Sequence, residues 1–268
     1  MTLGKYWAAL AISLRQANAA RAAFFGRVVF YGVLIAMYAR IWQIVGAHGS
    51  LGVFGHRDLI WYLALTEWIA LSVPPLHLEL ENDVRTGAIA YFLPRPISYL
   101  WLRFSEALGT MLLRMALLGT FGFAVAWFLA SDATSVGALP SGGALALVCG
   151  AFVAFLAALL NLVFSALIGL CAFFIQDTSP VYWVWQKLGF VFGGLLFPLE
   201  LYPDSIRQVA SFTPFPSLLY APGKIAVGAD APFVWHSLLL LGMWGLIGVS
   251  SAHFAFGRAR KSLEINGG

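Results

Sequence analysis

The sequence predicts an all-α membrane protein with six transmembrane helices. We also expect an amino-terminal interfacial helix, a short cytoplasmic helix between spans two and three, and short outer re-entrant helices before span six. Hydrophobic residues make up 60% of the 268 residues and charged residues only 10%, whereas soluble domains carry roughly 25% charged residues. Aromatic residues reach 15%, which is typical of lipid-facing surfaces with interfacial belts. A soluble globular fold is therefore excluded, and the chain is expected to form a single membrane domain over residues 1–268.

Six stretches are long and apolar enough to cross a bilayer, which takes about 20 residues. The fifth stretch is interrupted by Lys187 and by Gly193–Gly194. The predicted spans are residues 23–45, 58–78, 104–129, 143–172, 184–200 and 233–256.

The basic residues near the span ends predict that both termini are cytoplasmic, because cytoplasmic loops are enriched in Lys and Arg. The side that carries the termini holds eleven of them: Lys5, Arg15, Arg21, Arg27, Arg85, Arg95, Arg103, Lys187, Arg258, Arg260 and Lys261. The opposite side holds four, namely Arg40, Arg57, Arg207 and Lys224. A bacterial plasma (inner) membrane is the expected location.

Residues 1–22 are too often interrupted by polar side chains to be a secretory signal. On a helical projection Leu3, Trp7, Leu10 and Leu14 share one face, and Lys5, Ser13 and Gln16 lie roughly opposite. This pattern predicts a helix in the cytoplasmic interface. The alternative is a plain cytoplasmic extension of the first span.

The inner segment 79–103 is the longest cytoplasmic connection between spans. Its first part is charged and ends at Gly87, which predicts a short helix with a stop. Pro94 and Pro96 then force an extended turn before span three. The apolar residues between these parts fit two interpretations: a surface that docks onto another protein, or side chains buried in the membrane interface.

The outer segment 201–232, with the residues just before it, is rich in proline. Six of the chain's 12 prolines fall between residues 198 and 232. Residues 204–212 and 218–227 are each long enough for a short helix but not for a span. We expect a re-entrant pair, because backbone at membrane depth must be covered by protein. A loop lying on the outer headgroups is the alternative.

Several kinds of chemistry have no motif in the sequence. There is no phosphate-binding Gly-x-x-x-x-Gly-Lys-Ser/Thr loop, no Gly-x-Ser-x-Gly nucleophile elbow, and no paired-histidine metal pattern. Cys149 and Cys171 lie in one apolar stretch and read as small core residues. The chain is therefore not expected to be an enzyme, to carry a cofactor or metal, or to bind nucleic acid.

Three charged residues are predicted to lie inside the spans: Arg40, Glu67 and Arg114. A lone charge in the hydrocarbon is costly. Helix lengths place Glu67 and Arg114 both near the midplane, so a pair between them is expected, with Arg40 as the competing partner of Glu67. A single deep acid gives little support to a proton-relay transporter.

Taken together, the arrangement resembles the ABC-2 type permeases, the membrane subunits of type-2 (type V) ABC exporters. Segment 81–98 is similar to the loop that such permeases carry after span two. Segments 197–203 and 213–216 are similar to the family's outer segment. The resemblance covers nearly the whole chain and does not identify a substrate.

The resemblance implies that the chain works with two ABC ATPase subunits, a second permease, identical or related, and membrane lipid. Segment 79–103 would be the cytoplasmic coupling loop that receives motion from the ATPase. The residues implied in coupling are Glu79, Glu81, Asp83, Arg85, Gly87, Tyr91 and Arg95. The substrate path would be lined by spans one, two and five. An ion-coupled secondary transporter or another non-ATPase polytopic membrane protein is the alternative.

Overall fold

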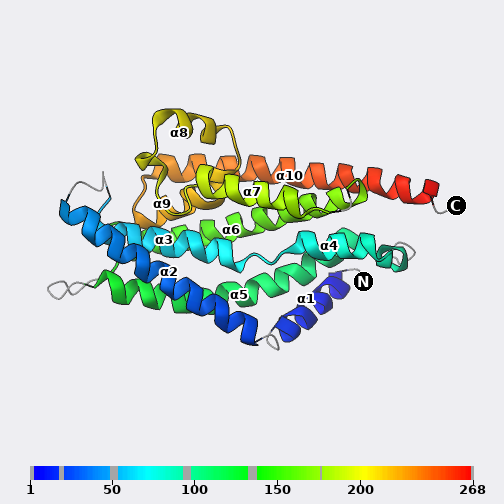
Figure 1. Ribbon diagram of the computed structural model, residues 1–268, viewed down its shortest axis with the longest axis horizontal. Helices are drawn as coiled ribbons and strands as arrows, with labels where there is room; N and C mark the ends of the chain where they lie inside the picture. The colour runs from blue at the N-terminus through cyan, green and yellow to red at the C-terminus, as the bar shows by residue number, and fades with distance from the viewer. Residues whose placement is uncertain are drawn as a thin grey trace.

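The structure is a computed structural model that describes residues 3–17, 21–48, 54–92, 98–131, 138–175 and 177–266. Within these ranges the chain folds into helices and turns, without a strand. The long helices run along one axis of the molecule (Figure 1). Helix α1 begins, and α10 ends, at the end of the bundle where α4 lies (Figure 1). We call this the inner end and the opposite one the outer end.

Five helical stretches of the described chain are long and apolar enough to cross a membrane. They cover residues 24–45, 56–85, 99–130, 143–173 and 231–259. They belong to α2 (Arg21–His48), α3 (His56–Ser72) with α4 (Leu76–Arg85), α5 (Tyr99–Ala130), α6 (Gly143–Leu170) and α10 (Ala231–Asn266). The fifth predicted span differs, because α7 (Ser179–Phe192) has only 14 residues and ends before the two glycines.

The second span is broken rather than continuous. Helix α3 ends at Ser72, Val73 is extended, and α4 starts at Leu76. Pro74 and Pro75 cause this break, since proline disfavours helical backbone in the preceding residue and lacks an N–H. Helix α4 ends at Arg85, and Gly87 has a positive φ of 71°, which confirms the stop predicted at this glycine. The 3-10 turn η1 (Ala88–Tyr91) follows.

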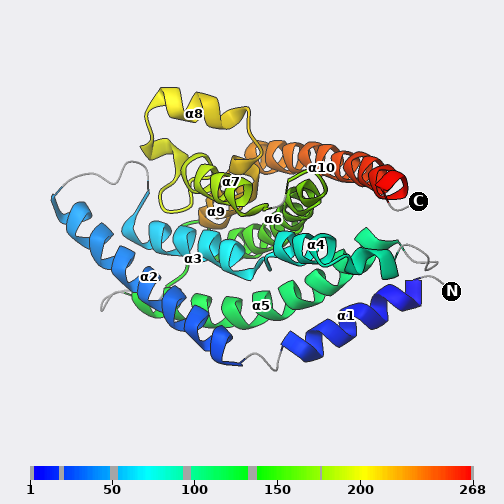
Figure 2. The ribbon, with the colours of Figure 1, turned by 45° about the vertical axis from the view of Figure 1, so that its right-hand side comes forward.

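Helix α3 is the centre of the packing. Seven of its apolar residues have no exposed surface: Leu59, Ile60, Tyr62, Leu63, Ala64, Leu65 and Ile69. It is surrounded by α2, α5, α6 and α9 (Figure 2). By contrast, α10 lies at the edge of the bundle, and only 11% of its most apolar stretch is buried. The chain is therefore organised around span two.

Helix α1 (Leu3–Ala17) packs along the inner half of α5. Ala9 and Ser13 are the buried residues of this contact. A side chain at Gly109 of α5 would meet the Ser13 hydroxyl and the Leu10 carbonyl, so the absence of a side chain allows the close approach. Trp7 is 66% exposed, in keeping with the lipid-facing role predicted for it, but Ser13 faces protein rather than water.

The outer segment forms short helices, as predicted. It contains η3 (Leu199–Leu201), α8 (Asp204–Ser211), the π-helical turn η4 (Pro216–Tyr220) and α9 (Ala221–Val227). The 3-10 turn η2 (Cys171–Phe173) lies elsewhere, between α6 and α7. Helix α9 is buried against α3 and α6, where Ala226 touches Gly150. It therefore lies inside the bundle rather than over its end.

Candidate functional site

The two faces of α4 differ sharply in burial. Leu80, Glu81 and Asp83 point inward and are only 1%, 8% and 5% exposed, whereas Asn82 and Arg85 are exposed. The same division continues into η1. Ile89 is buried, and Tyr91 is 76% exposed. The α4–η1 segment thus has one face packed against the protein and one face exposed.

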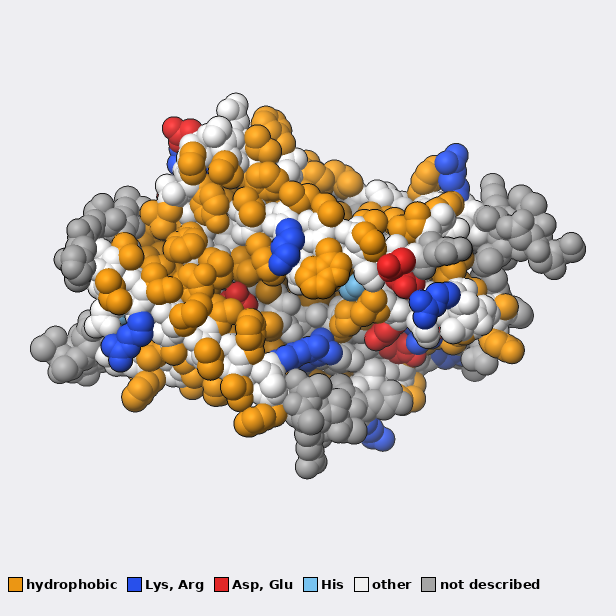
Figure 3. Space-filling view, viewed as in Figure 1, with side chains coloured by type: hydrophobic (Ala, Val, Ile, Leu, Met, Phe, Trp, Pro, Cys, Tyr) orange, Lys and Arg blue, Asp and Glu red, His pale blue; other side chains and the backbone are white. Residues whose placement is uncertain are grey.

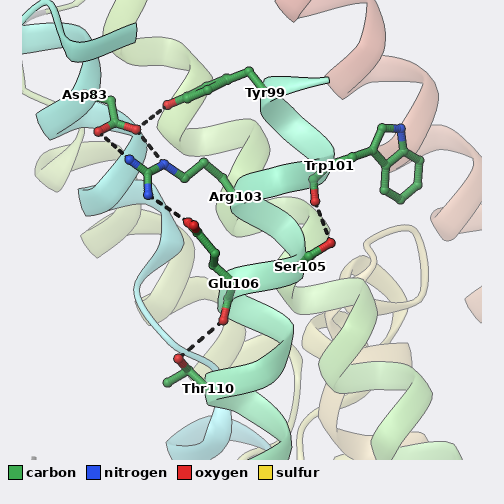
Figure 4. Close-up of polar contacts among 7 residues, drawn as sticks. All are labelled: Asp83, Tyr99, Trp101, Arg103, Ser105, Glu106 and Thr110. Atoms are coloured by element: carbon green, nitrogen blue, oxygen red, sulfur yellow. Dashed lines mark hydrogen bonds and ion pairs between the residues drawn. The ribbon is translucent and has the colours of Figure 1, made fainter. Parts of the chain in front are cut away.

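Asp83 attaches α4 to the start of α5 (Figure 4). Its Oδ2 accepts hydrogen bonds from Nε of Arg103 and from the Tyr99 hydroxyl, both at 2.7 Å. Its Oδ1 accepts from Nη2 of Arg103 at 2.8 Å. Arg103 also donates through Nη1 to Glu106 at 2.7 Å. A two-point contact of a guanidinium with a carboxylate fixes orientation as well as distance, so α4 cannot turn about its axis without breaking it.

Glu81 attaches α4 to the start of α7. Its Oε2 accepts hydrogen bonds from the backbone N–H of Thr178 at 2.9 Å and from the Thr178 hydroxyl at 2.5 Å. Thr178 is the N-cap residue of α7. A carboxylate at this position satisfies a free backbone N–H, and its negative charge interacts favourably with the positive end of the helix dipole. Glu81 therefore holds Thr178, and with it the start of α7, in place.

The break between α3 and α4 is held from the other side by a histidine. His77 is 2% exposed, and its ring stacks on that of Tyr182 in α7 with 3.7 Å between centroids. Its backbone N–H donates to the Ser165 hydroxyl of α6 at 3.2 Å. Sequence reasoning missed His77, because a single histidine carries no pattern that reveals its partners.

The predicted coupling residues therefore fall into three groups. Exposed residues are Glu79, Arg85, Gly87 and Tyr91. Glu81 and Asp83 are buried and contact other helices of the bundle. Arg95 lies outside the described residues.

The predicted pairing of Glu67 is wrong. The ion pairs among the described residues do not include Glu67, which is only 4% exposed. Arg40 instead donates to Gln43 at 3.0 Å, and the charges that act on Arg114 are those of Arg27 and Glu79. The prediction failed because depth along a helix does not fix the direction in which a side chain points: Glu67 is buried in α3, within range of Tyr31 and Tyr38 of α2.

The broken outer end of α7 is held by α3 and α2. The Tyr62 hydroxyl donates to the carbonyl of Gly194 at 2.5 Å, and that of Thr66 donates to the carbonyl of Leu195 at 2.7 Å. Three rings then meet, with centroids 5.5 to 6.4 Å apart: Tyr38, Trp42 and Phe197. Helices α2 and α3 therefore both contact the segment that follows α7.

A charged cluster at the outer end also escaped sequence reasoning. Oε1 of Glu200 accepts from the Tyr220 hydroxyl at 2.6 Å and from Nζ of Lys224 at 2.5 Å. Nζ of Lys224 also lies 4.5 Å from the centre of the Phe233 ring. Burial, together with the hydrogen bond to Glu200, raises the pKa of Tyr220. The cluster ties α9 to η3 and to the start of α10.

Comparison with protein families gives one result that bears on the whole bundle. A family model described as ABC-2 family transporter protein matches residues 31–267. The match begins within α2 and ends beyond α10, so it covers both attachments of α4 and the whole outer segment. A comparison with curated proteins finds no match.

Proposed function

The chain belongs to the ABC-2 family of transporter proteins, and on this premise we propose that it is the permease subunit of an ATP-binding-cassette exporter. In this proposal ATP is hydrolysed by separate ATPase subunits and the chain itself is not an enzyme. The observation that carries the proposal is the two-faced α4–η1 segment. It is attached inside to α5 and α7, and it presents Asn82, Arg85 and Tyr91 to the outside.

An ATPase needs a rigid surface to push on. A segment that hung from α3 alone would swing about the Pro74–Pro75 break without moving the bundle. The contacts of Asp83 with Arg103 and of Glu81 with Thr178 prevent this, because they join α4 to two further helices. A displacement at Arg85 or Tyr91 would thus reach α3, α5 and α7 together. This arrangement suits a coupling helix.

We propose that the chain crosses the membrane six times, with α7 and the segment after it as the fifth crossing. The support is a parity argument. Helix α1 begins and α10 ends at the same end of the bundle (Figure 1), which five crossings alone would not allow. Helix α7 starts beside Glu81 at the inner end, and just beyond its last residue the carbonyls of Gly194 and Leu195 accept hydrogen bonds from Tyr62 and Thr66 of α3.

The proposed location is a bacterial plasma membrane with both termini in the cytoplasm. On the face seen in Figure 3, hydrophobic side chains cover most of the surface over α2, α3 and α7. Charged side chains gather toward the end that carries α4 (Figure 3). The excess of Lys and Arg on the side of the termini supports the orientation.

We further propose a complex of two such permeases, identical or related, with two ATPase subunits. Helices α2 and α7 support the second permease, because both expose apolar side chains that the chain itself does not cover. They include Phe25, Phe30, Val33, Met37, Val181, Trp183, Val184 and Leu188. The substrate path would then lie where α2, α3 and α7 meet.

The proposal is tested by expressing the chain together with its neighbouring ATPase gene and measuring the native mass of the purified complex. Tyr91→Ala with Arg85→Glu should release the ATPase while leaving the thermal unfolding temperature of the permease unchanged. The matched control is Arg207→Glu at the outer end, which should keep the complex intact. A wild-type chain that purifies without any ATPase, or a double variant that retains it fully, would contradict the proposal.

A further inference from the structure

Two arginines come together where α2 and α5 meet near the inner end. The positions of Arg27 and Arg114 follow from the helix register. Tyr31 of α2 packs directly on Gly122 of α5, and both helices run from the inner toward the outer end (Figure 2). Arg27 lies about 6 Å inward of Tyr31, and Arg114 about 12 Å inward of Gly122, at 1.5 Å per residue. Arginine side chains are long enough to cover the remaining difference of about 6 Å, and the two guanidinium groups lie within range of each other's charge.

These like charges have no sufficient counter-charge within the described part of the chain. Neither arginine forms an ion pair there. Nη1 of Arg114 is buried and has no hydrogen-bond acceptor. Glu79 is the one acid whose charge acts on Arg114, and it also lies near the charges of Arg103, Glu106 and Asp83. A bound anion would offset the repulsion between the two cations and would supply the missing acceptor for the buried donor. Both the repulsion and the unsatisfied donor cost free energy when no anion is present.

The depth of the two arginines along the membrane-spanning helices indicates which kind of anion can reach them. The apolar part of α2 follows Arg21 in the sequence, and Arg27 lies less than two helical turns beyond Arg21. By the same register, Arg114 is also level with the first turn of that apolar part. This is the inner boundary of the hydrocarbon, where the phosphate groups of lipids are found. Tyr182 of α7 also lies within range of the Arg27 charge.

We propose that Arg27 and Arg114 form a binding site for the phosphate group of a phospholipid in the inner leaflet. Guanidinium groups bind phosphate through paired, charge-assisted hydrogen bonds, and basic pockets between spanning helices are suited to lipid headgroups. Nη1 of Arg114 gains its missing acceptor, and the lipid chains lie along the exposed Phe25 and Val29 of α2. The site needs the chain to lie in a membrane and does not depend on the proposed ATPase.

The test measures lipid retention by native mass spectrometry of the detergent-purified protein. Added phosphatidylglycerol should remain bound, and diacylglycerol with the same acyl chains should not. Arg27→Gln and Arg114→Gln should each weaken phosphatidylglycerol binding about tenfold, since one charge-assisted hydrogen bond contributes roughly that factor. Arg258→Gln is the control, because Arg258 is an exposed inner cation that lies over the Phe254 ring.

The source of the phosphate is tested by competition. Millimolar inorganic phosphate should leave phosphatidylglycerol bound, and displacement by it would overturn the assignment to a lipid. Equal retention of diacylglycerol, or full retention of phosphatidylglycerol by the Arg27→Gln/Arg114→Gln double variant, would also overturn the site. Arg27→Lys and Arg114→Lys control for loss of folding, because they keep the positive charge. Both variants should retain part of the lipid binding and should unfold at the same temperature as the wild type.

Discussion

The carboxylate of Asp83 and the guanidinium of Arg103 meet side by side, with Oδ2 2.7 Å from Nε and Oδ1 2.8 Å from Nη2. The two residues lie 20 positions apart in sequence, on opposite sides of the turn between α4 and α5. Arg103 keeps 20% of its side chain exposed and Asp83 only 7%. The pair therefore joins the end of α4 directly to the first turns of α5.

The first prediction concerns this pair. Asp83→Asn should lower the free energy of unfolding by about 2 kcal/mol, because it leaves the half-buried Arg103 guanidinium without its counter-charge. The measurement is the thermal unfolding of the purified protein, with a double-mutant cycle that includes Arg103→Gln. The exposed pair of Arg207 with Asp204 is the matched control and should contribute less than about 1 kcal/mol. Equal losses at both pairs would show that Asp83 does not anchor α4.

The second prediction concerns Glu81 and Thr178. Glu81→Gln should loosen the first turn of α7, because a neutral amide is a weaker acceptor for the N–H and hydroxyl of Thr178. Hydrogen exchange should speed up in the amides of residues 178–182 and remain unchanged in α10.

The control for the second prediction is Asn82→Ala, since Asn82 is the exposed neighbour of Glu81 on α4. We expect it to leave hydrogen exchange in α7 unchanged. In the complete transporter, Glu81→Gln should reduce transport more than it reduces ATP hydrolysis. Unchanged exchange at the start of α7 in Glu81→Gln would mean that the contact does not hold this helix in solution.

These two pairs show what the sequence could predict and what it could not. Hydropathy identifies long spans because the signal is spread over about 20 residues, and Gly87 marks a helix stop because its positive φ suits glycine. The third span was predicted to start at residue 104, but α5 starts at Tyr99. From sequence alone Arg103 resembles a solvent-exposed residue at a span boundary, because its partner Asp83 cannot be identified. Glu81 and Thr178 lie 97 positions apart, and their contact depends on how α4 is rotated about its axis. No local pattern encodes that rotation.

The third prediction concerns the attachment of α1. Gly109→Val should separate α1 from α5, because a Cβ atom at Gly109 would lie 2.1 Å from the Ser13 hydroxyl and 2.6 Å from the Leu10 carbonyl. We expect a loss of roughly 1–3 kcal/mol from overpacking, and faster proteolysis within residues 1–17. Gly26→Val is the control, since nothing lies within 4 Å of a Cβ atom there. Similar proteolysis of both variants would show that α1 does not depend on this contact.

The last prediction concerns Glu67, which is buried beside Tyr31 and Tyr38 and has no ion pair among the described residues. Because no arginine depends on it, Glu67→Gln should change the free energy of unfolding by less than about 1 kcal/mol. A neutral carboxyl group and an amide of the same shape make similar demands on apolar surroundings. Arg40→Gln should be equally mild, since Arg40 only donates to Gln43.

Thermal unfolding and transport, measured on the same Glu67→Gln preparation, separate the possible roles of this acid. Wild-type stability with lost transport would assign Glu67 to the path where α2, α3 and α7 meet. Wild-type stability with full transport would leave it as a packing residue. A loss of several kcal/mol would contradict the prediction, because it would mean that Glu67 is ionised and paired in the assembled transporter, with a cation that comes from another subunit or a ligand.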